Sequence, residues 1–147
     1  MLPLHRLVHL IETRSQDLAA DLVRQTKVSP STPDYKNVPD EELRDRVYEI
    51  YRHLGDWLLA KDERQVERRY QRIGAERAAQ NVPFSQVAWV IVLTKKNLWE
   101  FLKKETEGQN PEKPRETLAL LLLLDQFFDQ ALCSAAAGHE QHKAEPR

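Results

Sequence analysis

Three charged side chains, Arg77, Lys95 and Asp125, occupy positions where helical periodicity predicts apolar residues. Each continues a run of apolar residues spaced three or four apart. An isolated charge is expensive to bury, so each should be paired, should reach the surface with its stem, or should bind a ligand. We expect Asp125 to pair with Arg77 or Lys95. The three residues are therefore candidates for a buried ion pair or for a pocket that binds an anion or carboxylate.

The five histidines raise the question of a metal ion or haem. His5 and His9 are four residues apart, which lets two side chains of one helix share a metal, with Glu12 as a possible third ligand. Solvent exposure is the interpretation we favour for this pair, and no metal site is predicted. His53 flanks an apolar stripe and is the candidate for an axial haem ligand. A partly buried, hydrogen-bonded His53 is the simpler interpretation, so we expect no cofactor.

Motifs for catalysis are missing from the sequence. It contains no HExxH, GxSxG or Walker motif, and its single cysteine excludes an internal disulfide or a CxxC zinc site. Only four glycines are present, which leaves few residues for a phosphate-binding loop. The chain balances 22 basic against 23 acidic residues, which argues against nucleic acid as a partner. We expect a protein that is not an enzyme and has no catalytic residues.

Proline and glycine divide the sequence into five predicted helices separated by short breaks. The predicted helices cover 3–26, 40–60, 63–80, 84–105 and 115–137, with an ordered loop over 28–38. At 147 residues the chain fits one domain, which we place at 1–137, followed by a polar, frayed tail at 138–147. The pattern predicts an all-α fold, packed as a compact bundle or in a globin-like manner.

Location and association follow from the apolar residues. The longest apolar run, from Leu118 to Leu124, has seven residues, far short of a membrane span, and no signal peptide is visible. We therefore expect a cytoplasmic protein without membrane contact. Surplus apolar residues lie outside the predicted inner stripes and suggest a homodimer. The interface candidates are Trp89, Leu93, Leu120 and Leu123.

Two segments, Ile73–Val87 and Leu93–Phe101, carry a family resemblance. They contain a glycine, an Arg-Ala pair, a Val-Pro turn and a basic residue before Leu-Trp, at Gly74, Arg77, Ala78, Val82, Pro83, Lys95 or Lys96, Leu98 and Trp99. This pattern resembles the N-terminal sensory domain of RsbR-type stressosome co-antagonists, of the RsbRD N-terminal type.

The resemblance implies a compact five-helix, globin-like bundle that lacks haem. It further implies a non-enzymatic sensory domain that acts through helix-mediated association with itself and with a regulatory partner. The alternative is a globin-like sensor that binds haem or a small ligand. The resemblance supplies no catalytic residues.

Overall fold

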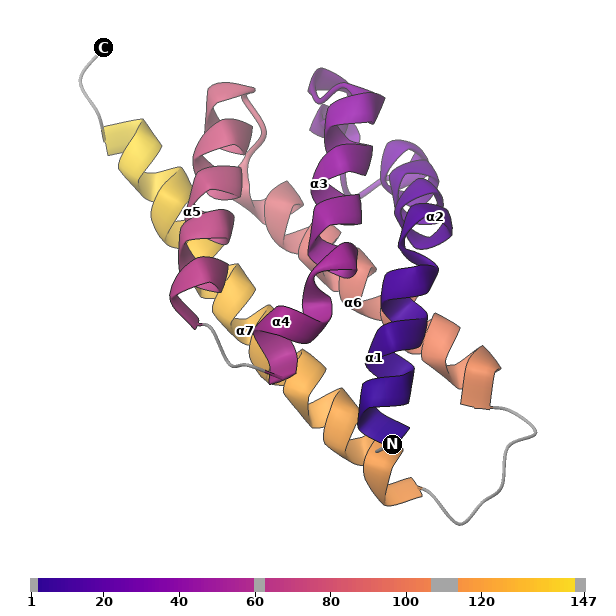
Figure 1. The fold of residues 1–147 in the computed structure, drawn as a ribbon. Coiled ribbons are helices and arrows are strands. Elements are labelled where there is room, and N and C mark those ends of the chain that lie inside the picture. The colour runs from indigo at the N-terminus through magenta and orange to yellow at the C-terminus, as the bar shows by residue number, and fades with distance from the viewer. Residues whose placement is uncertain (1–2, 60–62, 107–113, 145–147) are drawn as a thin grey trace.

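The computed structural model describes residues 3–59, 63–106 and 114–144 (Figure 1). These residues are helical nearly throughout, and no strand occurs among them. The elements are α1 (Pro3–Thr13), α2 (Ser15–Val28), the 3-10 helix η1 (Pro33–Asn37), α3 (Asp40–Arg52), α4 (Leu54–Leu59), α5 (Glu63–Ala79), α6 (Phe84–Thr106) and α7 (Pro114–Ala144). The all-α prediction is confirmed.

The prediction of five helices is wrong, because the described residues form seven α-helices. The helix expected over 3–26 divides at Arg14, whose φ and ψ are −100° and 14°. The helix expected over 40–60 divides at His53, with φ −108° and ψ 15°. Neither break contains proline, and at both points φ and ψ differ from helical values by more than the usual scatter of about 15–20°. The apolar spacing continues across each break, so the sequence pattern does not reveal them. Globin-like packing stays a prediction.

The last helix continues past the point where we expected it to stop. Helix α7 runs through Gly138 to Ala144, so the expected frayed tail from 138 is wrong for residues 138–144. Glycine at position 138 serves packing here and does not end the helix. A Cβ at Gly138 would lie 1.9 Å from the carbonyl oxygen of Gln71 in α5. The close approach of α5 supports this last part of α7.

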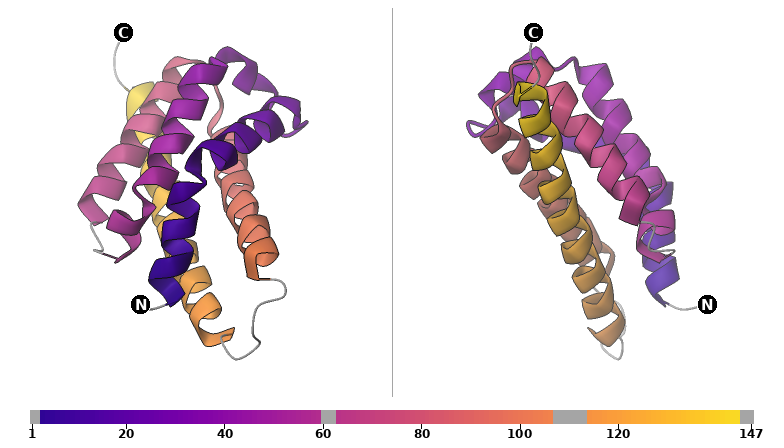
Figure 2. Two further views of the ribbon diagram at one scale, coloured as in Figure 1. Left: turned by 45° about the vertical axis from the view of Figure 1, so that its right-hand side comes forward. Right: turned by 90° about the vertical axis from the view of Figure 1, so that its left-hand side faces the viewer.

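Helices α5 and α7 lie side by side, as both views of Figure 2 show, and they make the most extensive helix contact in the described fold. Gly74 of α5 makes the same kind of approach as Gly138. A Cβ added at Gly74 would lie 2.1 Å from the carbonyl oxygen of Ala135. Real Cβ atoms do not approach backbone so closely, so these two glycines allow the helices to touch backbone to backbone.

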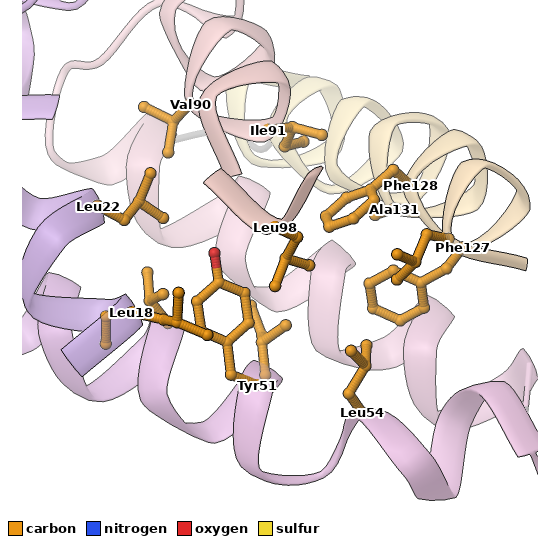
Figure 3. Close-up of a cluster of buried hydrophobic side chains, with 14 of the residues drawn as sticks. Leu18, Leu22, Tyr51, Leu54, Val90, Ile91, Leu98, Phe127, Phe128 and Ala131 are labelled. Atoms are coloured by element: carbon orange, nitrogen blue, oxygen red, sulfur yellow. The ribbon is translucent and has the colours of Figure 1, made fainter. Parts of the chain in front are cut away.

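The hydrophobic core lies between these helices and α2, α3, α4 and α6 (Figure 3). Helix α7 contributes a buried row at helical spacing, which consists of Leu120, Leu124, Phe127, Ala131 and Ala135. The core also contains a hydrogen-bonded polar group. Asn97 Nδ2 donates to the Leu18 carbonyl at 3.1 Å and to the Tyr51 hydroxyl at 3.2 Å. This pairing offsets the cost of burying Asn97 and connects α6 with α2 and α3.

The segment Leu118–His142 of α7 is long and apolar enough to cross a membrane by length and composition. A core helix meets the same criterion. In this fold the segment packs along α5 and contributes to the core, so its apolar character has a structural use within the domain.

Candidate functional site

Arg77 is buried near the end of α5, with 1% of its surface exposed. Its Nη1 donates to Gln80 Oε1 at 2.8 Å and lies 3.2 Å from Glu42 Oε1 in the first turn of α3. Gln80 Nε2 also donates to both oxygens of Glu42, at 3.1 and 3.0 Å. The guanidinium carbon lies 5.9 Å from the centre of the Tyr35 ring. Arg77 therefore joins α3, α5 and η1, and these contacts account for its charge without a ligand.

Tyr35, on η1, is almost completely buried against Arg77. Burial raises the pKa of its phenol to about 12, and the charge of Arg77 opposes part of this rise. Lys27 Nζ donates to the carbonyl oxygens of Tyr35 and Val38 and lies 3.0 Å from Asp40 Oδ1. The short 3-10 helix is thus held in place by Arg77 of α5, which contacts the Tyr35 ring, and by Lys27 of α2, which contacts its backbone.

Lys95 and Asp125 meet between α6 and α7, with Lys95 Nζ 2.7 Å from Asp125 Oδ1. Asp125 therefore lies with Lys95, and Arg77 is held elsewhere, by Glu42. Asp125 Oδ1 is shielded from water, but the contact is an ion pair without hydrogen-bond geometry. The side chains are 34% and 38% exposed. A pair with that exposure contributes at most about 1 kcal/mol, well below a fully buried one.

An open cavity of about 760 Å³ lies beside this ion pair, between α6 and α7. Among the described residues its apolar wall consists of Val92, Trp99, Leu102 and Leu121. Lys95 belongs to the lining, and its Nζ lies 5.6 Å from the centre of the Trp99 ring. The volume falls within the range of small-molecule sites, roughly 300–1,000 Å³. We refer to this cavity as the α6/α7 groove.

The four interface candidates differ in their exposure. Trp89 is 49% exposed, as an interface residue requires, while Leu93 and Leu123 are half-buried and pack against the core. Leu120 is wrong as an interface candidate, because it is completely buried. Five consecutive leucines obscure the inner face of α7, so the sequence pattern did not show which of them point outward.

The leucines of α7 that do face outward are Leu118 and Leu122, at 56% and 55% exposure. On α6, Val92 and Trp99 join Trp89 with 49% and 40% exposure. None of these four residues is among the interface candidates expected from the sequence. Helical spacing along α6, three residues from Trp89 to Val92 and seven from Val92 to Trp99, would have indicated the two on that helix. We call the five exposed residues the α6/α7 patch.

The histidines do not form a haem site. The side chain of His53 is 53% exposed, and its Nδ1 lies 3.7 Å from Asp56 Oδ2 at the surface. The cavity enclosed by α3, α5, α6 and α7 has about 40 Å³, room for little more than a water molecule, and His53 does not line it. These residues therefore do not fit haem.

Three of the remaining histidines, His5, His9 and His139, are also accounted for without a cofactor. His5 and His9 are exposed, and Glu12 accepts a hydrogen bond from the Gly55 amide at 3.1 Å. Within the described ranges no group of three His, Cys, Asp or Glu side chains is placed to hold a metal ion. His139 is buried, and its Nε2 lies 2.8 Å from the Val82 carbonyl. This contact attaches α7 to the turn between α5 and α6.

That turn contains part of the pattern on which the family resemblance rests. Asn81 has a φ of 60°, so it forms a left-handed cap at the end of α5. The Val82 amide donates to the Arg77 carbonyl at 3.0 Å, and the Asn81 amide donates to the Ala78 carbonyl at 3.1 Å. This pair of bonds is the Schellman arrangement at the end of a helix. The Arg-Ala and Val-Pro pairs are therefore structural parts of one helix end.

Comparison with protein families decides the identity. The family described as the RsbT co-antagonist protein rsbRD N-terminal domain matches residues 16–146. The chain belongs to this family. No curated protein and no solved structure matches the sequence.

Membership makes this rsbRD N-terminal domain a signalling domain of the stressosome, in a family that is not a known enzyme family. The match includes every residue on which the resemblance rested. It also includes the pair of Arg77 with Glu42 and the pair of Lys95 with Asp125. The matched segment ends beyond Ala144, so α7 belongs to the family domain to its last described residue.

Proposed function

We propose that this rsbRD N-terminal domain acts without catalysis, by associating through α6 and α7 with a second copy and with a regulatory protein. The observation that carries the proposal is the α6/α7 patch. Exposed apolar residues scattered singly are ordinary, but neighbouring ones on two adjacent helices are typical of interaction sites. The core of such an interface is enriched in aromatic residues, and the patch contains Trp89 and Trp99.

The two helices present these residues on a common outer surface. Leu121 of α7 lines the same groove as Trp99 of α6, and Lys95 pairs with Asp125 across the two helices. Leu118 and Leu122 lie seven and three residues before Asp125, so they share its side of α7, next to Lys95 of α6. Polar residues such as Lys96 and Glu100 stand among the apolar ones, as in the rim of an interface.

We infer a cytoplasmic domain whose partners are proteins and do not include nucleic acid or membrane. The arginine-rich face of α5 supports the exclusion of nucleic acid, because acidic residues partly neutralise it. Arg69 of α5 pairs with Glu49 of α3, and Glu63 and Glu67 stand among the arginines of α5. A surface neutralised in this way attracts phosphate weakly.

Sedimentation velocity at tens of micromolar protein tests self-association. We expect a dimer for the unmodified chain and a monomer for Leu122→Glu, because the new charge would be buried without a partner. The matched control is Val28→Glu, which places the same charge on an exposed apolar residue of α2, outside the patch. A monomeric unmodified chain, or equal association of both variants, would overturn the proposal.

A further inference from the structure

The α6/α7 groove combines an apolar wall with positive charge. Its described lining contains three lysines, Lys95, Lys96 and Lys103, and one acidic residue, Glu100. The chain as a whole has a net charge of −1, so this excess of positive charge is local. An apolar surface next to cationic groups is complementary to a molecule with an apolar body and a negative head.

The lysines differ in what they can offer to a ligand. Lys95 is already paired with Asp125 and stands over the Trp99 ring. Lys96 is exposed at the groove and has no ion-pair partner among the described residues. Lys103 also has an interaction of its own, so Lys96 is the ammonium group left for a ligand among these three lysines, and it suits one negative charge. A doubly charged head would need a second cation that is not held by an acidic partner.

We propose that the α6/α7 groove binds an amphipathic monocarboxylate, with its carboxylate at Lys96 and its apolar chain against Trp99, Val92 and Leu121. The open side of the groove admits a chain from solvent, and its apolar wall buries that chain. The ion pair of Lys95 with Asp125 joins the two helices that line the groove. The proposal deepens the proposed sensory role and rests on it for its biological meaning, although binding itself does not require association.

Isothermal titration of the full chain with sodium decanoate, below its micellar concentration, tests the proposal, and Trp99 fluorescence gives a second readout. We expect saturable binding of one decanoate per chain. Lys96→Gln should weaken the binding about tenfold, since one charge-assisted hydrogen bond is lost. Lys36→Gln, which removes an exposed lysine from η1, is the matched control and should leave the affinity unchanged.

Two other amphiphiles test separately the contributions of the negative charge and of the apolar chain to binding. Decanol has the same apolar chain without the charge, and decyltrimethylammonium has the opposite charge. We expect decanol to bind more weakly than decanoate and the cation to bind most weakly of the three. Equal affinity of decanoate for the unmodified chain and Lys96→Gln would overturn the proposal, as would equal affinity for the cation.

The state of association is recorded by sedimentation on the same samples, so the two proposals can fail separately. A dimer that binds no decanoate would indicate that a second copy fills the groove, and it would overturn the ligand proposal alone. A monomer that binds decanoate with the expected dependence on Lys96 would support the ligand proposal while overturning self-association.

Discussion

Gly74→Ala is the change that tests most directly how α5 and α7 pack. A methyl group at this position would lie 2.1 Å from the carbonyl oxygen of Ala135 and 3.0 Å from the amide nitrogen of His139. Both atoms are backbone, so no side chain can rotate away. The two helices must separate by roughly 1 Å, a gap that costs the lining atoms a quarter to a half of their dispersion energy.

The magnitude follows from two opposing effects. Alanine is favoured over glycine inside a helix by roughly 1 kcal/mol. Overpacking of a rigid contact costs roughly 1–3 kcal/mol and occasionally more, and a backbone contact belongs at the upper end. The helix contact affected is the most extensive in the described fold. We therefore expect Gly74→Ala to lower the free energy of unfolding by about 2–4 kcal/mol.

Urea unfolding followed by circular dichroism at the helical band measures the effect. The unfolding midpoint of Gly74→Ala should fall by roughly 1–2 M at an unchanged slope. Gly55→Ala is the matched control, because its added Cβ would lie 3.1 Å from Glu12 Oε2 and from Val8 Cγ1, which are side-chain atoms that can move. We expect that variant to stay within about 1 kcal/mol of the unmodified chain. A Gly74→Ala protein as stable as the unmodified chain would refute the backbone-to-backbone packing described above.

Two further predictions concern the polar contacts around η1. Glu42→Gln should lower the free energy of unfolding by about 3 kcal/mol, because it leaves the buried Arg77 charge without a counterion. The control is Glu41→Gln at the neighbouring exposed position, which should change the free energy of unfolding by less than about 0.5 kcal/mol. Equal unfolding midpoints of the two variants in urea would contradict the pairing of Glu42 with Arg77. The pKa of the Tyr35 phenol is raised to about 12 in the folded protein, so the phenol ionises more readily in the unfolded chain. The resulting contribution to the free energy of unfolding is complete below pH 10 and is lost between pH 10 and about 12. Stability should fall by about 3 kcal/mol over this range on account of Tyr35, and the fall should be smaller in Tyr35→Phe; the same pH dependence in both proteins would show that the phenol is not held as described.

How far the sequence predicts this fold is best judged from particular elements. The absence of strands, the left-handed cap at Asn81 and the Val-Pro turn after α5 follow from local rules, because glycine and proline positions and helical periodicity act over a few residues. The breaks at Arg14 and His53 do not follow from such rules. There the chain bends so that each half can pack against different helices, and no residue type at the break announces it.

For the charged residues too, local spacing predicted some features and tertiary packing decided others. Helical spacing identified Arg77, Lys95 and Asp125 as unusual, but it assigned all three to one inner region. In the structure Arg77 is enclosed by α3 and η1, and Lys95 and Asp125 meet at the partly exposed seam of α6 and α7. The partner of Arg77, Glu42, is 35 residues away along the chain, a distance at which sequence periodicity gives no information.

Helix α7 shows most clearly which features the sequence predicts and which depend on packing. Its run of leucines determined that it is a helix with apolar residues on more than one side, while the resemblance to the rsbRD N-terminal family rested on motifs elsewhere in the chain. Which leucines face the core was decided by the packing of α7 against other helices, among them α1, α4, α5 and α6. This packing buries Leu120 and leaves Leu118 and Leu122 exposed. Local residue patterns determined the helices of this protein, and the packing of helices distant in sequence decided which of their surfaces can bind a partner.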